Sequence, residues 1–244
     1  MENGLLIGLS RQMTLRRMLD VTANNIANMS TAGFKLERPL LSSHEAGGDA
    51  RAADGGAIHF VRDYGFMRDF TPGQLEPSGR PLDVALGGDG FFSIQTPEGE
   101  TRYTRDGRFT LNAEGQLATA AGHLVLDDGG APIDLPTDGV TPTIDANGAI
   151  LLDGGAIAQL GIVRFDDTAA LTKAGDGGYA TDQQALPAED PQARQGYIEE
   201  SNVNPIEEIT RLIDVTRTYQ SVSNLISTDE DLRRRAIDKL SGVR

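Results

Sequence analysis

Hydrophobic side chains recur at helical spacing near both ends of the chain and alternate with polar ones in the middle. Leu5 to Ile26 and Ile206 to Leu240 lack proline and place apolar residues three or four positions apart, which predicts two amphipathic helices. Between them, short apolar alternations are broken by Gly, Asp and Pro, as in strands joined by tight turns. The pattern predicts an α+β fold, with N- and C-terminal helices paired as a coiled-coil-like domain and a central, mainly antiparallel β domain.

Each expected helix carries a main apolar stripe with a second row beside it. The second rows are Leu6, Leu9 and Met13 in the first helix, and Ile206, Ile209 and Ile213 in the last. A stripe with 3-4 spacing is typical of a coiled-coil seam and requires a helical partner. We therefore expect subunits to pack through Leu5, Leu15, Leu19, Ile26, Leu212, Val215, Tyr219, Val222 and Ile226. The alternative is that both helices pack on their own β body, as in many α+β domains.

Four segments are expected along the chain. They are an N-terminal helical arm at 1–36, a partly extended linker region at 37–69, a β domain at 70–190 and a C-terminal helical arm at 191–244. Asn204-Pro205 supplies a cap and a first turn for the last helix. In the linker region, the Gly-rich stretches 46–50 and 52–56 indicate a loop.

The central domain predicts short strands separated by Gly-containing turns, as in a β meander or small barrel. The expected strands are 82–86, 91–94, 102–105, 108–111, 115–118, 123–126, 143–144, 149–152 and 160–165, with a late turn at 176–179.

The charge distribution separates the ends of the chain from its middle. The net charge is −14, which argues against nucleic acid as a partner. Residues 1–36 carry four basic and two acidic side chains, and residues 198–244 carry seven basic and nine acidic ones. The net charges of the two ends therefore cancel, and residues 37–197 carry the whole excess of negative charge. Small opposite charges favour pairing of the two arms, while an acidic body keeps neighbouring bodies apart.

No motif in the sequence indicates catalysis. The absence of cysteine excludes disulfides, thiolate metal sites and cysteine nucleophiles. His44, His59 and His123 lack the spacing of a metal pair. Residues 127–130 and 145–148 resemble calcium loops but lack the alternating ligands and the following Glu, which favours turns. We expect no enzyme activity, cofactor, metal or small-molecule substrate.

The sequence also shows no segment expected to enter a membrane. It has no run of about 18 apolar residues. Its first residues lack the basic segment and cleavage site of a secretory leader, so export would use a route that does not cleave one.

Four segments, in the same order, resemble the signatures of bacterial flagellar rod and hook proteins. Two lie at the ends of the chain: Ala23 to Lys35, with Ala-Asn-Asn-Ile-Ala-Asn and Thr-Ala-Gly-Phe-Lys, and Glu200 to Asn204, which leads into the last helix. The other two are in the β body: Gly79 to Phe92, with Gly-Arg-Pro-Leu-Asp-Val-Ala-Leu, and Tyr103 to His123, with Tyr-Thr-Arg-Asp-Gly-Arg-Phe.

The resemblance implies a structural subunit of the flagellar basal-body rod whose terminal helices form an inner tube that transmits torque. It implies export by the flagellar type III apparatus and a place in the rod in the periplasm. Implied partners are copies of itself and other proximal and distal rod subunits. The short chain and the sequence at 161–167 favour the proximal over the distal rod type. The rival readings are a secreted β-domain binding protein or enzyme with helical ends, and a self-contained structural monomer.

Overall fold

The computed structural model describes the backbone of residues 2–45, 59–136 and 141–241, and the side chains of residues 6–40, 65–136 and 141–239. The described elements are α1 (Glu2–Ala27), β1 (Glu37–Glu45), β2 (His59–Arg68), β3 (Leu75–Pro77), β4 (Val84–Leu86), β5 (Phe91–Gln95), β6 (Thr101–Thr104), β7 (Phe109–Leu111), β8 (Leu117–Thr119), β9 (Leu124–Val125), β10 (Thr143–Ile144), β11 (Ala149–Leu152), β12 (Gly155–Gln159), β13 (Ile162–Arg164), the short 3₁₀ helix η1 (Thr168–Ala170), β14 (Thr172–Lys173), β15 (Gly178–Ala180), β16 (Leu186–Pro187), β17 (Ala193–Gln195), β18 (Tyr197–Glu199) and α2 (Pro205–Ser241).

The chain divides into two compact units. The helical unit comprises 1–27, 37–69 and 204–244, and the β unit comprises 28–36 and 70–203. Residues 28–36 and 191–203, which the sequence grouped with the helical arms, cluster with the strands. Residues 37–69, the expected linker, cluster with the helices. The loop expected at 46–50 and 52–56 lies outside the described residues.

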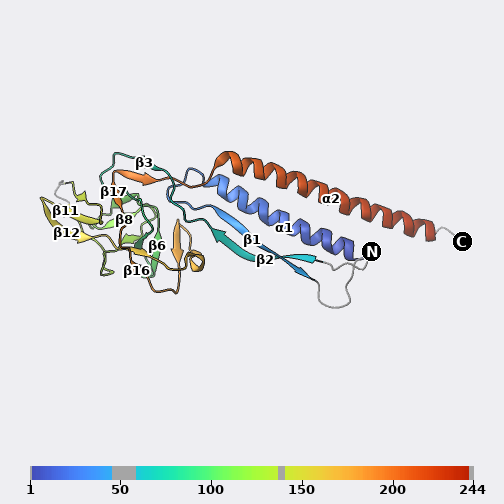
Figure 1. Ribbon diagram of the computed structural model, residues 1–244, viewed down its shortest axis with the longest axis horizontal. Helices are drawn as coiled ribbons and strands as arrows, with labels where there is room; N and C mark the ends of the chain where they lie inside the picture. The colour runs from blue at the N-terminus through green and yellow to red at the C-terminus, as the bar shows by residue number, and fades with distance from the viewer. Residues whose placement is uncertain (1, 46–58, 137–140, 242–244) are drawn as a thin grey trace. The chain divides into compact units, whose positions relative to one another are not determined.

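In the helical unit, α1 and α2 lie side by side and run in opposite directions (Figure 1). The start of α2 has the predicted cap: Asn204 Oδ1 accepts hydrogen bonds from the backbone N–H groups of Ile206 and Glu207 at 3.1 and 3.5 Å. Glu207 and Glu208 in the first turn and Lys239 in the last complement the helix dipole. These local signals agree with the helical periodicity, which located both helices to within a few residues.

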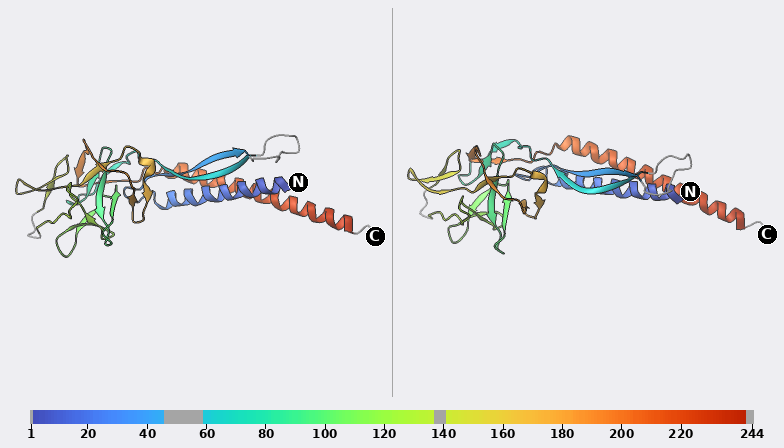
Figure 2. Two further views of the ribbon diagram at one scale, coloured as in Figure 1. Left: turned by 90° about the horizontal axis from the view of Figure 1, so that it is seen from below. Right: turned by 60° about the horizontal axis from the view of Figure 1, so that its bottom comes forward.

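Strands β1 and β2 form an antiparallel hairpin that runs along α1 in the same unit (Figure 2). The guanidinium of Arg17 lies 4.5 Å from the centre of the Phe66 ring, a cation–π contact between α1 and β2. The pairing register shifts between Pro39 and Leu41, where proline cannot donate to the ladder. The sequence analysis did not predict this hairpin.

Every strand pair described in the β unit is antiparallel. The largest sheet has the order β14-β15-β6-β5-β9-β8-β7, with β13 joining β5 to β16, and β10-β11-β12 form a second sheet. Two further pairs, β17 with β4 and β18 with β3, bring chain segments more than one hundred residues apart together. All nine strands expected from the sequence are present, with bounds within two residues of those expected, and the α+β prediction is confirmed.

Three hydrophobic clusters lie in the β unit, the smallest being Phe34, Leu36 and Val203, and the other two form most of its core. The larger is mainly aliphatic and includes Phe92 and Phe109, whose rings meet edge to face at 5.0 Å. The smaller is mainly aromatic: Phe91, Phe165, Leu171 and Tyr179, with Phe70 and Tyr103 packed against them. Edge-to-face contacts in this cluster supply packing specificity without tryptophan.

Candidate assembly interface

The contact between α1 and α2 defines a seam within one chain. Gly8 lies against Ile226: a Cβ added at Gly8 would be 3.1 Å from Ile226 Cγ1. One turn on, Gln12 Nε2 donates a hydrogen bond to the Tyr219 hydroxyl at 3.1 Å. The absence of a side chain at Gly8 thus lets the helices approach closely near the start of α1.

The nine residues expected to pack subunits mostly lie on this seam. Leu15 and Val215 are buried, with 2% and 6% of their surface exposed. The half-buried ones are Leu19, Ile26, Leu212, Tyr219, Val222 and Ile226. The side chain of Leu5 lies outside the described residues. In a single chain, the described seam residues therefore already serve to pair α1 with α2.

A buried polar network closes one end of the seam. Asn25 Nδ2 donates to Glu208 Oε2 on α2 at 3.0 Å and to the Glu37 carbonyl on β1 at 2.8 Å, and Asn25 Oδ1 accepts from the Glu37 N–H at 3.0 Å. The Glu37 carboxylate accepts from Arg68 Nε on β2 at 3.0 Å. Asn25 therefore fixes α1, α2 and β1 against one another. The sequence analysis placed this asparagine only within the signature segment Ala23 to Lys35.

The second rows of apolar residues remain exposed. The exposed large hydrophobic side chains include Leu6, Leu9 and Met13 on α1, and Ile206, Ile209 and Ile213 on α2. Single exposed apolar residues are ordinary, but rows at helical spacing indicate a binding surface. The helical unit thus pairs its own helices and still presents apolar surface.

The β unit contains a buried cluster of three charges. Lys35 Nζ lies 2.5 Å from Glu199 Oε1, and Arg105 Nη1 lies 3.6 Å from Glu199 Oε2, with all three side chains at most 1% exposed. Lys35 also donates to the Thr71 carbonyl at 2.8 Å, and Glu199 accepts from the Gly73 N–H at 2.9 Å. One carboxylate therefore holds together the segment after α1, the start of the β domain and its last strand.

Burial lowers the pKa of the Arg105 guanidinium, while the negative charges of Glu199 and Asp89 act in the opposite direction. Arg105 donates to the Gly88 carbonyl at 3.0 Å and lies 5.1 Å from the centre of the Phe91 ring. Its Nε has no hydrogen-bond partner among the described residues. Removing the carboxylate of Glu199 would leave two buried cations without compensation, so this side chain holds the cluster together.

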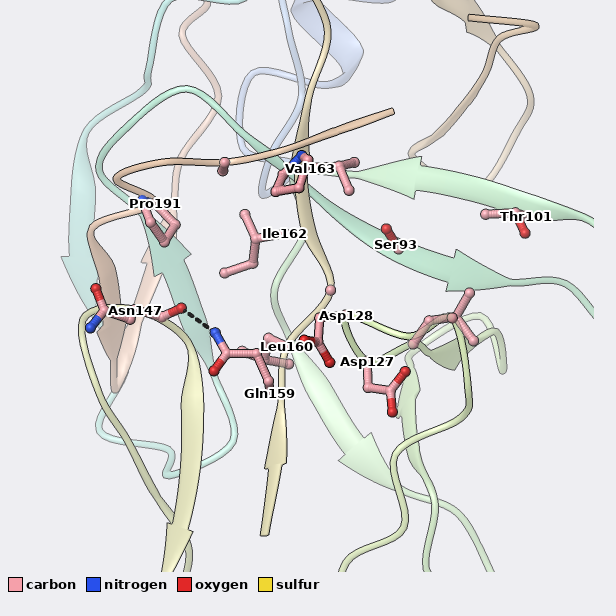
Figure 3. Close-up of a pocket in the computed structure, with 15 residues that line it drawn as sticks. Ser93, Thr101, Asp127, Asp128, Asn147, Gln159, Leu160, Ile162, Val163 and Pro191 are labelled. Carbon is pink, nitrogen blue, oxygen red and sulfur yellow. Dashed lines mark hydrogen bonds between the residues drawn. The ribbon is translucent and has the colours of Figure 1, made fainter. Parts of the chain in front are cut away.

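A hollow of about 330 Å³ opens on the β unit beside β13 (Figure 3). Asp127 and Asp128 are the ionisable side chains among its lining residues, and Gln159 Nε2 donates to the Asn147 carbonyl at 2.7 Å. Asp127 accepts a hydrogen bond from the Ala131 N–H at 2.8 Å, as expected of a turn. The lining contains no histidine, lysine, arginine or tyrosine.

The described residues include no group of three or more histidine or acidic side chains able to hold a metal ion. His123 Nε2 lies 3.6 Å from Asp176 Oδ2. The side chains of His44 and His59 are outside the described residues. Neither described helix combines the length and the hydropathy of a membrane span.

Comparisons with known proteins point in the same direction. Residues 5–35 match the model for flagella basal body rod proteins, residues 85–152 the flagellar hook protein FlgE/F/G D1 domain, and residues 194–239 the flagellar basal body rod FlgEFG protein C-terminal.

Relatives of full length carry related names. The FlgF rod protein of Caulobacter vibrioides is 43% identical over 246 residues, covering all of both chains. The FlgF rod protein of Rhizobium meliloti is 36% identical over 253 residues, again covering both completely. The FlgG rod protein of Bacillus subtilis is 33% identical over 265 residues, covering 98% of this chain and 99% of its own.

A helix pair with exposed apolar rows, joined in sequence to an antiparallel β unit, together with these matches defines a structural subunit of the flagellar axial class. The chain belongs to the flagellar basal-body rod protein family, as a structural subunit of the FlgF type. This family is not enzymatic, and membership implies assembly with other rod subunits in the basal body.

Proposed function

We propose that the chain is a subunit of the proximal rod that assembles helically with copies of itself and with adjoining proximal and distal rod subunits. The helical unit forms the inner tube, so that torque passes along the rod. One observation carries this proposal: α1 and α2 satisfy their main seam within a chain yet expose two further apolar rows. Burying these rows against neighbours gives the driving force for assembly.

We propose that the nine seam residues act in subunit packing by holding α1 and α2 as one paired element. Leu15 and Val215 form its buried centre, so the outer rows face neighbours in a fixed arrangement. A charge introduced into the seam would separate the helices and disperse those rows. Subunit packing then depends on the seam.

We propose that the chain reaches the periplasmic part of the rod through the flagellar type III export apparatus. The full-length similarity to flagellar basal-body rod proteins supports this route. Partly disordered terminal helices in the free subunit would suit passage through a narrow export channel.

The test is complementation of a strain that lacks this chain. Val222 is half-buried on the seam, and Ser221 beside it is exposed. Val222→Asp should give non-motile cells whose basal bodies lack the chain, whereas the matched control Ser221→Asp should restore motility. Circular dichroism of the purified Val222→Asp protein should still report the folded β unit. Cells that build functional rods from Val222→Asp alone would contradict the proposal.

An electron-microscopy map of the basal body would place the chain. Density for it between the membrane ring and the distal rod supports the proximal assignment, and density in the distal rod overturns it.

A further inference from the structure

The exposed apolar rows of the helical unit have matching chemistry and spacing. The row on α1 consists of Leu6, Leu9 and Met13, and we call it the distal row. The row on α2 consists of Ile206, Ile209 and Ile213, and we call it the basal row, since it lies at the Asn25–Glu208 end of the seam. All six side chains are 45% to 78% exposed. Both rows follow the spacing i, i+3, i+7, which makes a straight ridge on a helix.

Both rows lie on the same face of the helix pair. At 3.6 residues per turn, each row is displaced from its own seam by about 130° in the same rotational sense. Since α1 and α2 are antiparallel, an equal rotation in the same sense brings the two rows to one side. On α1 that side is opposite the one where the buried Thr14 and Val21 and the hydrogen bonds of Asn25 to β1 are found. The rows therefore face away from the β1–β2 hairpin.

Along the helix pair, the rows are separated. Gln12 contacts Tyr219, so in the antiparallel pair Leu9 is level with about Val222. Val222 is about thirteen residues beyond Ile209, which corresponds to roughly 20 Å along the axis at 1.5 Å per residue. The two rows of one chain therefore cannot touch each other.

We propose that the distal row of one copy of this chain binds the basal row of a second copy. If the copies are parallel, displaced by roughly 20 Å along the helix axis and rotated about that axis so that the two rows face each other, α1 of one meets α2 of the next in antiparallel order. Leu6 then lies by Ile213 and Met13 by Ile206. This proposal rests on the proposed function and specifies its contact.

Charge complementarity favours a second copy as the occupant. Glu2 begins α1 one turn before Leu6, and Arg217 follows Ile213 by one turn. In the antiparallel alignment of the two rows, these opposite charges fall at the same level. Arg217 is exposed, and no ion pair to it is found within the described residues. An ion pair between copies at the edge of an apolar contact sets register and orientation.

The contact is heterologous, because two different surfaces meet. Each copy leaves its opposite row free for the next, so the contact repeats without closing and produces a helical array. Three side chains per row bury much less than the about 800 Å² per partner of a stable interface. A single contact is therefore weak, and the array depends on many such contacts.

The absence of cysteine from this chain makes disulfide crosslinking a sharp test. Leu9→Cys and Ile209→Cys are introduced singly and together in motile cells, and purified basal bodies are treated with a mild oxidant. The double variant should give a ladder of covalent multimers, and each single variant should give none. A bond within one chain is excluded, because the two positions are roughly 20 Å apart and a disulfide needs Cα atoms within about 7 Å.

The matched control pairs Leu9→Cys with Leu225→Cys. Leu225 is 67% exposed but lies on the opposite face of α2, so this pair should give no ladder. A ladder from the control pair, or a dimer from Leu9→Cys alone, would overturn the proposal. So would basal bodies that contain the double variant without crosslinks, although the proposed function would stand. If the native chain is missing from basal bodies, the proposed function fails as well.

A charge exchange tests the register independently. Arg217→Glu and Glu2→Lys should each reduce motility by several-fold in swimming assays, and the two together should restore most of it. A combined variant no more motile than Arg217→Glu would overturn the antiparallel register.

Discussion

Asn25 on α1 donates a hydrogen bond to the carboxylate of Glu208 on α2, across 3.0 Å and with both side chains almost fully buried. The same amide makes two hydrogen bonds to the Glu37 backbone. An apolar residue here would allow the helices to slide along the seam, whereas a buried polar pair permits one register. The position of every exposed row relative to the seam follows from that register.

Asn25→Ala should lower the free energy of unfolding of the helical unit by about 2–3 kcal/mol, since it leaves the Glu208 carboxylate and the Glu37 N–H buried with fewer partners. Urea denaturation followed by circular dichroism at 222 nm measures this loss. Asn224→Ala, at an exposed position on α2, is the matched control and should change stability by less than about 0.5 kcal/mol. Equal effects of both substitutions would show that the network does not contribute.

In the β unit, Glu199→Gln should destabilise more than Lys35→Met. Glu199 faces both buried cations, so its neutralisation removes their shared counter-charge and should cost about 3–5 kcal/mol. Lys35→Met keeps the Arg105–Glu199 pair and should cost less. Thermal unfolding of both variants measures which substitution destabilises the β unit more. A larger loss from Lys35→Met would contradict the role of Glu199 as the shared partner.

Alanine substitutions at two glycines distinguish the energetic cost of backbone strain from the cost of a steric collision. Gly33 and Gly79 both have positive φ, +68° and +70°, but a Cβ at Gly33 would lie 2.6 Å from the Asp106 nitrogen while one at Gly79 would meet nothing within 4 Å. Gly79→Ala should cost about 1 kcal/mol from backbone strain alone, and Gly33→Ala clearly more. Chemical denaturation compares them. Similar losses would mean that the chain around Asp106 moves aside freely.

Alkaline pH should weaken the β unit partly through Tyr103. Burial raises the pKa of the Tyr103 phenol above the value of about 10 for an exposed tyrosine. With the higher pKa in the folded state, stability is complete below about pH 10 and is lost as the pH rises through the folded-state pKa. Tyr103→Phe should therefore lose less stability between pH 8 and pH 11 than the native chain. Equal losses in urea titrations at the two pH values would exclude this contribution.

The sequence predicted those parts of the fold that local patterns specify. Helical periodicity and the Asn204 cap located both helices, and the turn glycines located nine strands. The β1–β2 hairpin was missed because its first strand contains Pro39 and lacks regular alternation; pairing with β2 and packing against α1 define it.

The polar network and the ion cluster were also beyond sequence reasoning. Lys35 and Glu199 are 164 residues apart, and neither differs in sequence from a solvated surface charge. Asn25 and Glu208 likewise join through the tertiary fold alone. In contrast, the sequence did separate the second apolar rows from the seam, since spacing alone fixes which side of a helix a residue occupies.

Helix α2 has 37 residues and α1 has 26. Because Asn25 and Glu208 hold the two level at one end, the whole difference, roughly 16 Å of helix, protrudes at the other. Subunits stacked in the proposed manner would give one end of the array a crown of bare helix ends instead of a flat rim. An incoming subunit would contact these helix ends before it reached its final position, which favours ordered growth over random attachment.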